Sequence, residues 1–265
     1  MLPMTKRILL LAGLAPMLAC SQEHGEPPVK APFAKGEDSL CVNDWWNRPA
    51  PARPRDRILD LKVPRDQVLA FGLYTVMDGK LKLSAQLYPL YPEETRTVRL
   101  EIEKAGEWQE IAREEVNDLG WSALFEVADW PADRDVRYRL RHGERAMFEG
   151  LVRRDPKDKN EIVLAALSCN SNQDRGMREN YVRNINHQDP DLVFFAGDQS
   201  YDHKEHTAAW LKFGLQFREV FRNRPCISIP DDHDIGQGNL WGEGGKRAEL
   251  ASGTDRSSNC PAARC

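Results

Sequence analysis

The sequence predicts an all-β sandwich followed by an α/β layer. Short apolar runs with a period of two fill the stretch from Ile58 to Arg153. Longer apolar runs joined by helical patterns follow, after the charged link "KDKNE". A period of two is typical of half-buried strands, whereas continuous apolar runs joined by helices are typical of parallel strands covered on both faces. At 265 residues the chain is long enough for one large domain or two of ordinary size.

Seven short runs in the first half predict seven strands. They read "VLAFGLYTV", "LKLSAQLYPL", "RTVRLEIEK", "WQEIARE", "WSALFEV", "VRYRLRH" and "AMFEGLV". Glycine and proline residues separate them, as hairpin and Greek-key loops require. This pattern favours an immunoglobulin-like or fibronectin-like sandwich, which we place at residues 41–154. The tryptophans of this half are expected to pack in the sheets rather than to bind sugars: Trp108, Trp121 and Trp130.

The second half, placed at residues 155–265, alternates strands and helices. Ile162 to Leu167 is the first predicted strand, "DLVFFA" is the second and "CISIP" is the third. Residues 174–188 and 205–222 show helical spacing between them. Three polar residues are available to cap the first helix: Ser171, Asn172 and Asp174. Strands joined in this way predict a parallel sheet with helices packed on it.

The first twenty residues have the composition of an export signal. Lys6 and Arg7 precede an apolar run, Ile8 to Ala19, that is too short to cross a bilayer as a helix. The run ends "MLAC", which resembles the lipobox of bacterial lipoproteins, so membrane attachment through a lipidated Cys20 is expected. A simple signal peptide cleaved near this point is the alternative. The prediction is an exported lipoprotein of the outer membrane or periplasm, with residues 21–40 as a flexible tether.

Neither the net charge nor the cysteine content identifies a binding partner. The net charge of −4 gives no bias toward nucleic acid, so no nucleic-acid-binding surface is expected, and the oligomeric state is left open. With Cys20 and Cys169 set aside, the pairing of the other four cysteines also stays open: Cys41, Cys226, Cys260 and Cys265.

Metal-binding side chains follow each of the three predicted parallel strands. The first strand ends with "SCN" at 168–170, the second with "GDQSYD" at 197–202 and the third with "PDDHD" at 230–234. Loops at the carboxyl ends of parallel strands meet at one edge of the sheet, where open α/β folds place their ligands. The three motifs are therefore expected to lie together.

A thiol, a phenol, an imidazole and several carboxylates suit a metal centre. Together they supply hard oxygen ligands for a ferric or calcium-like ion and one soft ligand. Two ions that share a carboxylate could clamp the attacking and leaving oxygens of a phosphoryl transfer. These residue types indicate metal more directly than they indicate phosphorus chemistry.

At these motifs the sequence resembles the calcineurin-like metallophosphoesterases, in particular their alkaline phosphatase D-like branch. "GDQSYD" and "PDDHD" resemble the GDxx and GNH[DE] motifs, and "SCN" replaces the DxH motif. The cysteine, the tyrosine after GD and the DDH[DE] form are features of that branch, in which an immunoglobulin-like domain precedes the catalytic one. The stretch "GQGNLWGEGG", Gly236 to Gly245, is also similar to family sequence, and the resemblance covers roughly residues 40–250.

The resemblance implies a binuclear or multinuclear centre of Fe³⁺ and Ca²⁺. Cys169, Asp198 and Tyr201 would hold the ferric ion, with Asp198 bridging to a second site. Asp232 would hold the second ion and take part in catalysis, while His233 would stabilise or protonate the phosphoryl transition state. Two neighbours are candidates for ligands or for groups that orient ligands: Asp231 and Asp234.

Each of these residues has a structural alternative. Cys169 could be an inert core thiol, and Asp198 could cap a turn. Tyr201 could be a buried aromatic with a satisfied hydroxyl, and His233 could belong to a structural ion pair.

The implied function is metal-dependent hydrolysis of phosphate mono- or diesters. The family pattern needs two further histidine motifs, but no histidine follows His233, and the final stretch "SGTDRSSNCPAARC" has no strand or helix period. We therefore expect an incomplete catalytic domain: a truncated form with weak metal retention and weak or no activity. The alternative is a catalytically inactive exported lipoprotein whose β module binds a ligand or spaces a partner. The phosphate ester itself is left open.

Overall fold

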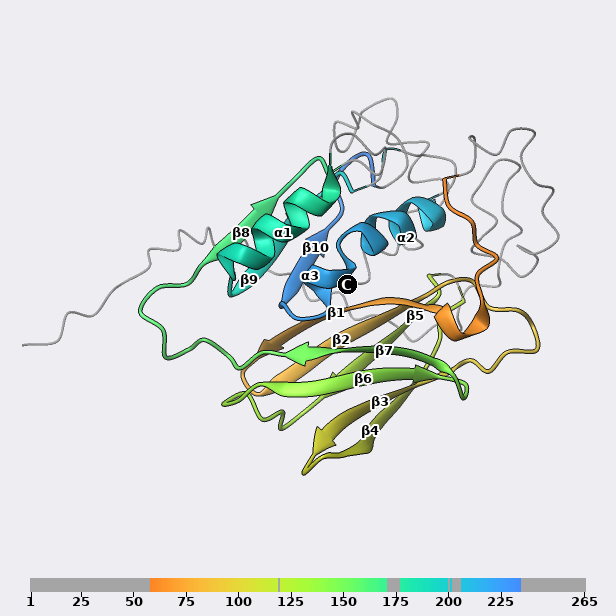
Figure 1. Cartoon of the computed structure of the whole chain (residues 1–265), viewed down its shortest axis with the longest axis horizontal. Coiled ribbons are helices and arrows are strands. Elements are labelled where there is room, and N and C mark those ends of the chain that lie inside the picture. Colours follow the sequence, from red (N-terminus) through yellow and green to blue (C-terminus); the bar gives the residue numbers. More distant parts are fainter. Residues whose placement is uncertain (1–57, 119, 171–176, 200, 202–205, 235–265) are drawn as a thin grey trace, which may run out of the picture. The chain divides into compact units, whose positions relative to one another are not determined.

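The computed structural model describes residues 58–118, 120–170, 177–199, 201 and 206–234 (Figure 1). The expected signal peptide, tether, glycine-rich stretch and C-terminal stretch lie outside these residues and stay predictions. In the described part, no helix is both long and apolar enough to cross a membrane.

Seven antiparallel strands form two sheets in the first half. After a short 3₁₀ helix, η4 (Arg65–Gln67), one sheet has the order β1-β2-β5 and the other the order β4-β3-β6-β7. Each of the seven alternating runs forms one strand. Their bounds are β1 Leu69–Met77, β2 Lys80–Leu87, β3 Thr97–Lys104, β4 Glu107–Glu115, β5 Ser122–Val127, β6 Val136–His142 and β7 Ala146–Val152.

Strand β6 is buried on one side only, whereas β1 is buried on both sides over Leu69 to Tyr74. In β6, Val136, Tyr138 and Leu140 are buried, while the arginines between them are exposed or half-buried. Trp121 and Trp130 are buried, as expected of packing residues. Trp108 instead lies half-buried beneath the guanidinium groups of Arg137 and Arg139, 5.5 and 4.4 Å from its ring centroid.

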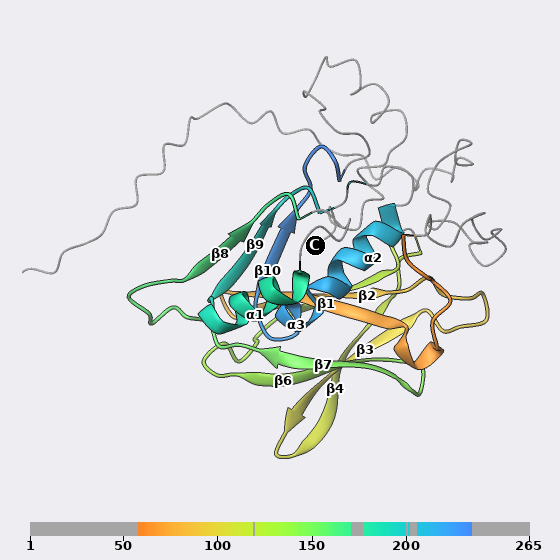
Figure 2. The ribbon, with the colours of Figure 1, turned by 45° about the horizontal axis from the view of Figure 1, so that its top comes forward.

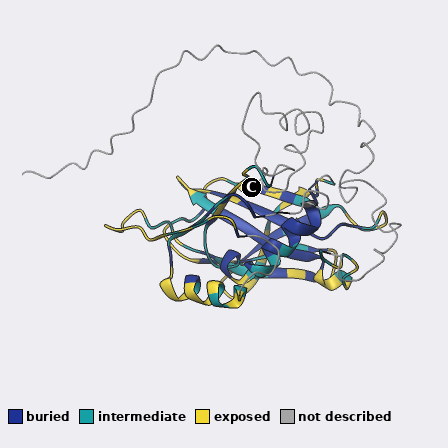
Figure 3. Ribbon diagram, turned by 90° about the horizontal axis from the view of Figure 1, so that it is seen from above, coloured by how far each residue is buried: buried dark blue, intermediate teal, exposed yellow. Residues whose placement is uncertain are grey.

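The second half contains a three-stranded parallel sheet. Strands β8 (Leu164–Leu167), β9 (Leu192–Ala196) and β10 (Cys226–Ile229) lie in the order β10-β9-β8, which confirms the predicted parallel pairing. Helix α1 (Arg178–Gln188) connects the first two strands and is mostly exposed, with Ile185 as its buried residue (Figure 3). Helices α2 (His206–Gln216) and α3 (Arg218–Phe221) connect the second and third strands.

The helix boundaries differ from the prediction in two places. The single helix expected over 205–222 is broken at Phe217, which has φ −105° and ψ 10° and packs its ring against Phe195 and Phe213. Helix α1 begins at Arg178, and its N-cap residue, Met177, makes no side-chain capping bond. The three expected capping residues lie outside the described part of the chain.

Strand β1 of the sandwich packs against the helices of the second half (Figure 2). The ring of Phe71 lies 5.9 Å from that of Trp210 and 5.6 Å from that of Phe221, measured between centroids. The Trp210 indole also donates a buried 2.9 Å hydrogen bond to Gln86. Gly214 allows this close approach, because a Cβ there would lie 1.9 Å from the Phe71 ring.

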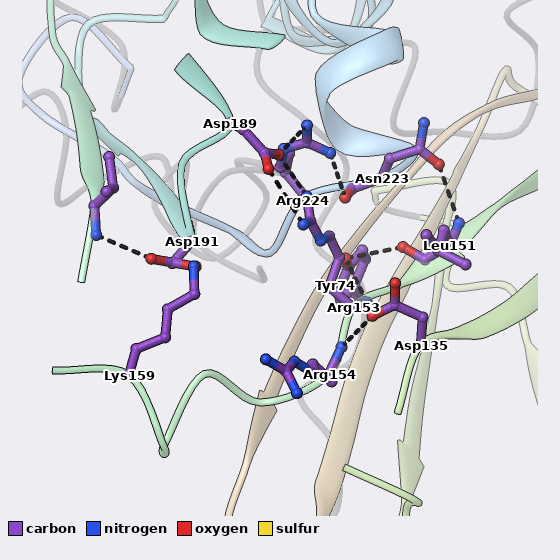
Figure 4. Close-up of polar contacts among 11 residues, drawn as sticks. Tyr74, Asp135, Leu151, Arg153, Arg154, Lys159, Asp189, Asp191, Asn223 and Arg224 are labelled. Carbon is purple, nitrogen blue, oxygen red and sulfur yellow. Dashed lines mark hydrogen bonds and ion pairs between the residues drawn. The ribbon is translucent and has the colours of Figure 1, made fainter. Parts of the chain in front are cut away.

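Polar contacts join the segment after β7 to the amino ends of β9 and β10 (Figure 4). Asp189 lies between Arg153, at 2.6 Å, and Arg224, at 2.5 Å. Asp191 pairs with Lys159 and accepts the Val163 amide hydrogen. We call this set of ion pairs the amino-edge latch. It anchors the connecting segment to the edge of the sheet opposite the three motif loops.

The burial of His142 predicts that the stability of the first half of the chain depends on pH. Its side chain is buried at the end of β6, and its Nε2–H donates to the Thr95 carbonyl at 2.8 Å. Burial lowers the pKa of His142 below its ordinary value. The unfolded chain therefore binds this proton at higher pH than the folded chain does, so stability falls as pH drops from about 6.5 through the lowered folded pKa.

We expect denaturant unfolding to show this loss between neutral and mildly acidic pH. A His142→Gln variant keeps an N–H donor but does not titrate, so its unfolding free energy should vary less over the same range. Equal pH dependence of the two proteins would assign the acid sensitivity to other groups.

Candidate metal centre

The three motif loops meet at the carboxyl edge of the parallel sheet. Cys169 follows β8, Asp198 and Tyr201 follow β9, and Asp231 to Asp234 follow β10. The Cys169 amide donates to the Gly197 carbonyl at 3.2 Å, and the Asp198 amide donates to Asp234 Oδ2 at 2.6 Å. Neighbouring loops are therefore tied together by hydrogen bonds as well as by the strands.

Two of the loop residues hold an uncommon backbone conformation. Cys169 has φ 55° and Asp198 has φ 59°. Both lie in the left-handed region of backbone conformation, which residues other than glycine seldom adopt. Gly197, with φ 92°, precedes Asp198, and a Cβ there would lie 2.3 Å from Asp231 Cβ. The same conformation occurs at five non-glycine residues outside the site, so the strain alone does not single out this edge: Asp78, Ala105, Trp121, Asp129 and Asp189.

Asp198 is at the centre of the group. Its side chain is buried, and Oδ2 accepts hydrogen bonds from the Tyr201 hydroxyl at 2.9 Å and the Cys169 thiol at 3.5 Å. Its other oxygen, Oδ1, is buried and has no hydrogen-bond partner among the described residues. A buried carboxylate oxygen without a partner is unfavourable, so a cation at this position would relieve the cost.

Asp232 and His233 complete a set of possible metal ligands. Asp198, Asp232 and His233 each offer one ligand atom, and the three atoms lie within 4.8 Å of one another. Carboxylate oxygens and an imidazole nitrogen suit divalent and trivalent cations. The donor set therefore fits a metal ion, and Cys169 and Tyr201 lie at hydrogen-bond distance from Asp198 Oδ2.

Tyr201 and His233 are stacked on each other. Their ring centroids are 4.1 Å apart, with an interplanar angle of 35°. Loss of solvent, and then hydrogen bonding with Cys169 and Asp198, raises the pKa of Tyr201 above its ordinary value. Without a metal the phenol thus keeps its proton, and its hydroxyl donates a hydrogen bond to the Asp198 carboxylate.

The remaining predicted residues take local roles. Asp231 is exposed, is absent from the ligand group, and accepts the Asp232 amide hydrogen through Oδ1 at 2.8 Å. Asp234 is buried, and its Oδ2 accepts both the Asp198 and Asp231 amide hydrogens, so it orients two loops at once. Asn170 is buried, and its side-chain nitrogen has no hydrogen-bond partner among the described residues.

Sequence reasoning missed Gln199. This fully buried side chain donates from Nε2 to Ser228 Oγ at 2.7 Å and to the Ile229 carbonyl at 3.0 Å. It therefore fastens the loop of Asp198 and Tyr201 to β10, the strand that leads into Asp231 to Asp234. One signal was present in the sequence: Ser228 is a polar residue at an inward position of an apolar strand, so it needs a buried partner.

Gln199→Ala is expected to weaken metal binding by about 10-fold, the lower end of what a residue that orients ligands contributes. The variant releases the contact between the two ligand loops without removing a ligand. Isothermal titration of the folded variant with Ca²⁺ measures the effect. Ser228→Ala is the matched control, because it removes one of the two Gln199 bonds and should have the smaller effect. Unchanged affinity in a folded Gln199→Ala protein would contradict the assigned role.

A cavity of about 300 Å³ lies at the amino-edge latch, on the opposite edge of the sheet. It is lined by Asp135, Arg153, Arg154, Pro156, Lys159 and Asp191. Arg153 and Lys159 are held by the carboxylates of Asp189 and Asp191, and Asp135 accepts the Arg154 amide hydrogen. These contacts serve to join segments of the chain, so the carboxyl edge is the stronger candidate for chemistry.

Comparison with known proteins shows a shared fold. No protein-family model and no curated protein matches the chain. The solved structure of PhoD matches 76% of this chain and 46% of its own at a TM-score of 0.57 and 16% identity. A purple acid phosphatase, PPD1 from yellow lupin (Lupinus luteus) seeds, matches 69% of this chain and 39% of its own at a TM-score of 0.47 and 13% identity. The chain thus spans less than half the length of either structure.

Proposed function

We propose that this chain belongs with the metal-dependent phosphoesterases and that its carboxyl-edge loops hold metal for phosphate-ester hydrolysis. One observation carries the proposal: the buried Asp198 carboxylate groups with Asp232 and His233, its Oδ1 has no hydrogen-bond partner among the described residues, and its Oδ2 accepts from Tyr201 and Cys169. The fold shared with PhoD supports it. The three-plus-four arrangement of the antiparallel strands also supports an immunoglobulin-like class for the first module.

The donor types suggest two different ion positions. Cys169 and Tyr201 offer sulfur and phenolate oxygen, which suit Fe³⁺, and Asp232 offers the oxygen that Ca²⁺ prefers. Asp198 could contribute to both positions through its two oxygens, because Oδ2 accepts hydrogen bonds from Tyr201 and Cys169 while Oδ1 has no hydrogen-bond partner among the described residues. Bound ions would neutralise the negative charge that develops on a phosphoryl group. With Asp231 exposed and directed to a backbone amide, few donors are available among the described residues, so we propose weak metal retention.

His233 is the proposed acid–base group. Its ring packs against that of Tyr201, at the same edge of the sheet as the carboxylates of Asp198 and Asp232. An imidazole in this position can donate a proton to a leaving alkoxide or stabilise charge on phosphate oxygens.

Attachment to the outer membrane or residence in the periplasm through a lipidated Cys20 is a further part of the proposal. Such a location would bring the site to exported or extracellular phosphate esters.

The test is hydrolysis of 4-nitrophenyl phosphate and bis(4-nitrophenyl) phosphate by the purified chain, with and without Fe³⁺ and Ca²⁺. We expect metal-dependent turnover that a chelator abolishes. His233→Gln should lower kcat by about 100-fold or more, within the range of a lost general acid. Metal content measured on the same samples separates the two roles of His233. Retained metal indicates an acid–base group, and lost metal indicates a ligand.

No turnover of either ester by a chain that binds metal would overturn the proposal. A folded chain that binds no metal would do so as well, and would leave an exported binding or spacer module as the remaining interpretation.

A further inference from the structure

The cavity of about 300 Å³ at the amino-edge latch has an excess of positive charge. All of the residues that line it belong to the described part of the chain. The cations among them are Arg153, Arg154 and Lys159, and the carboxylates are Asp135 and Asp191. The lining therefore carries one more positive than negative charge, which favours an anion over a cation.

The carboxylates of the cavity already accept hydrogen bonds. The Asp191 side chain is 9% exposed, and its two oxygens accept from Lys159 and from the Val163 amide. Asp135 Oδ1 accepts the Arg154 amide hydrogen at 2.9 Å. Calcium and magnesium ions bind through several free oxygens, so this arrangement is unfavourable for them.

The Arg154 guanidinium takes no part in the latch. Asp135 holds its backbone amide, but no described residue forms a hydrogen bond or an ion pair with its side chain. Figure 4 shows the guanidinium extending away from Asp135, toward the side on which Lys159 lies. The Lys159 ammonium gives one hydrogen to Asp191 and has others to offer, so donors remain on both cations.

We propose that this cavity binds a phosphate group through Arg154 and Lys159. A guanidinium presents parallel N–H groups that match two oxygens of a phosphate, and an ammonium adds a further charge-assisted hydrogen bond. A volume of about 300 Å³ is at the small end of ligand pockets, which suits a phosphate with at most a short substituent. The nearby Asp135 carboxylate repels an anion and limits the affinity to roughly millimolar.

The backbone around the cavity is fixed without a ligand. The Arg153 amide donates to the Tyr74 hydroxyl at 3.1 Å. The Lys159 amide closes a turn by donating to the Pro156 carbonyl at 2.9 Å. Because the backbone is held at these points, a ligand has to order little more than the Arg154 side chain.

Isothermal titration of the purified, chelator-treated chain with inorganic phosphate at constant ionic strength tests the proposal. We expect a Kd of roughly 1 mM. Arg154→Gln should raise this Kd by about 10-fold or more, because it removes charge-assisted hydrogen bonds and no latch contact. Lys157→Gln is the matched control. Lys157 is exposed in the same segment but does not line the cavity, so its loss should change the Kd by no more than about 2-fold.

Two further titrations sharpen the assignment. Arg154→Lys keeps the charge and loses the fork of N–H groups, so its affinity should lie between those of the wild type and Arg154→Gln. Glycerol phosphate as the titrant separates two sources of the same group. Tighter binding than that of inorganic phosphate would assign the cavity to phosphate monoesters, and equal or weaker binding would assign it to free phosphate.

A folded chain that binds no phosphate would overturn the proposal. Equal affinity of the wild type and Arg154→Gln would do so as well. Equal weakening by Arg154→Gln and Lys157→Gln would mean that phosphate responds to the overall surface charge and not to this cavity. The chelator keeps metal out of the carboxyl-edge loops, so these outcomes do not depend on metal binding or on phosphoesterase activity.

Discussion

Asp198→Asn is expected to lower the affinity of the chain for Fe³⁺ and Ca²⁺ by about 100-fold or more, beyond the effect of a residue that only orients ligands. The substitution keeps the shape of the side chain, and its amide oxygen can still accept the Tyr201 hydrogen bond. It removes the negative charge and the second carboxylate oxygen that the proposed bridge between ion positions requires. Metal stoichiometry and isothermal titration measure the loss.

The stability of the metal-free Asp198→Asn protein separates a metal site from a structural carboxylate. Asp198 is buried and forms no ion pair among the described residues, so removing its charge should leave the unfolding free energy unchanged or raise it. Asp231→Asn, in the neighbouring loop, is the matched control, because Asp231 is exposed and its Oδ1 can be replaced by an amide oxygen. If the two variants bind metal equally well, Asp198 is not the central ligand.

Gly214→Ala is expected to destabilise the folded chain by about 1–3 kcal/mol, the usual range for an overpacked core. In an exposed helix the same change would stabilise by up to about 1 kcal/mol, because alanine favours helix more than glycine does. Here the new Cβ would lie 1.9 Å from the Phe71 ring, which is itself fully buried between Trp210 and Phe221. Helix α2 or strand β1 must therefore move.

Denaturant unfolding of Gly214→Ala and of the double variant Gly214→Ala, Phe71→Leu tests this contact. The smaller leucine should relieve part of the overlap, so the two substitutions should be less damaging together than their separate effects add up to. Stabilisation by Gly214→Ala alone would mean that α2 and β1 do not approach each other closely.

The strands could be predicted because their periods are unambiguous. Alternation in "VRYRLRH" and the continuous run in "DLVFFA" each allow one placement. The first became β6 with those ends, the second became β9 without its aspartate, and β8 began at Leu164 rather than at the predicted Ile162. The helix ends could not be predicted as well. The break at Phe217 depends on how three aromatic rings pack around Phe195, which no spacing along the chain encodes.

The neighbours in the candidate site could be predicted from topology, because parallel strands bring their following loops to one edge. The direction of each side chain could not. Asp231 and Asp232 are adjacent in "PDDHD", yet Asp232 joins Asp198 and His233 while Asp231 turns to a backbone amide. Gln199 was missed for the same reason, since its role depends on the distance between two loops and not on its own chemistry.

The amino-edge latch lies at the opposite end of the parallel sheet from the proposed metal-binding loops. The ion pairs that join segments of the chain are therefore distinct from the residues proposed to bind metal. Arg153, Asp189 and Arg224 secure one end of the short parallel strands, and the motif loops extend from the other. Substitutions in the loops are therefore expected to act on the proposed metal site without weakening these ion pairs. For directed evolution this makes the carboxyl-edge loops suitable targets for randomisation, with the latch kept constant.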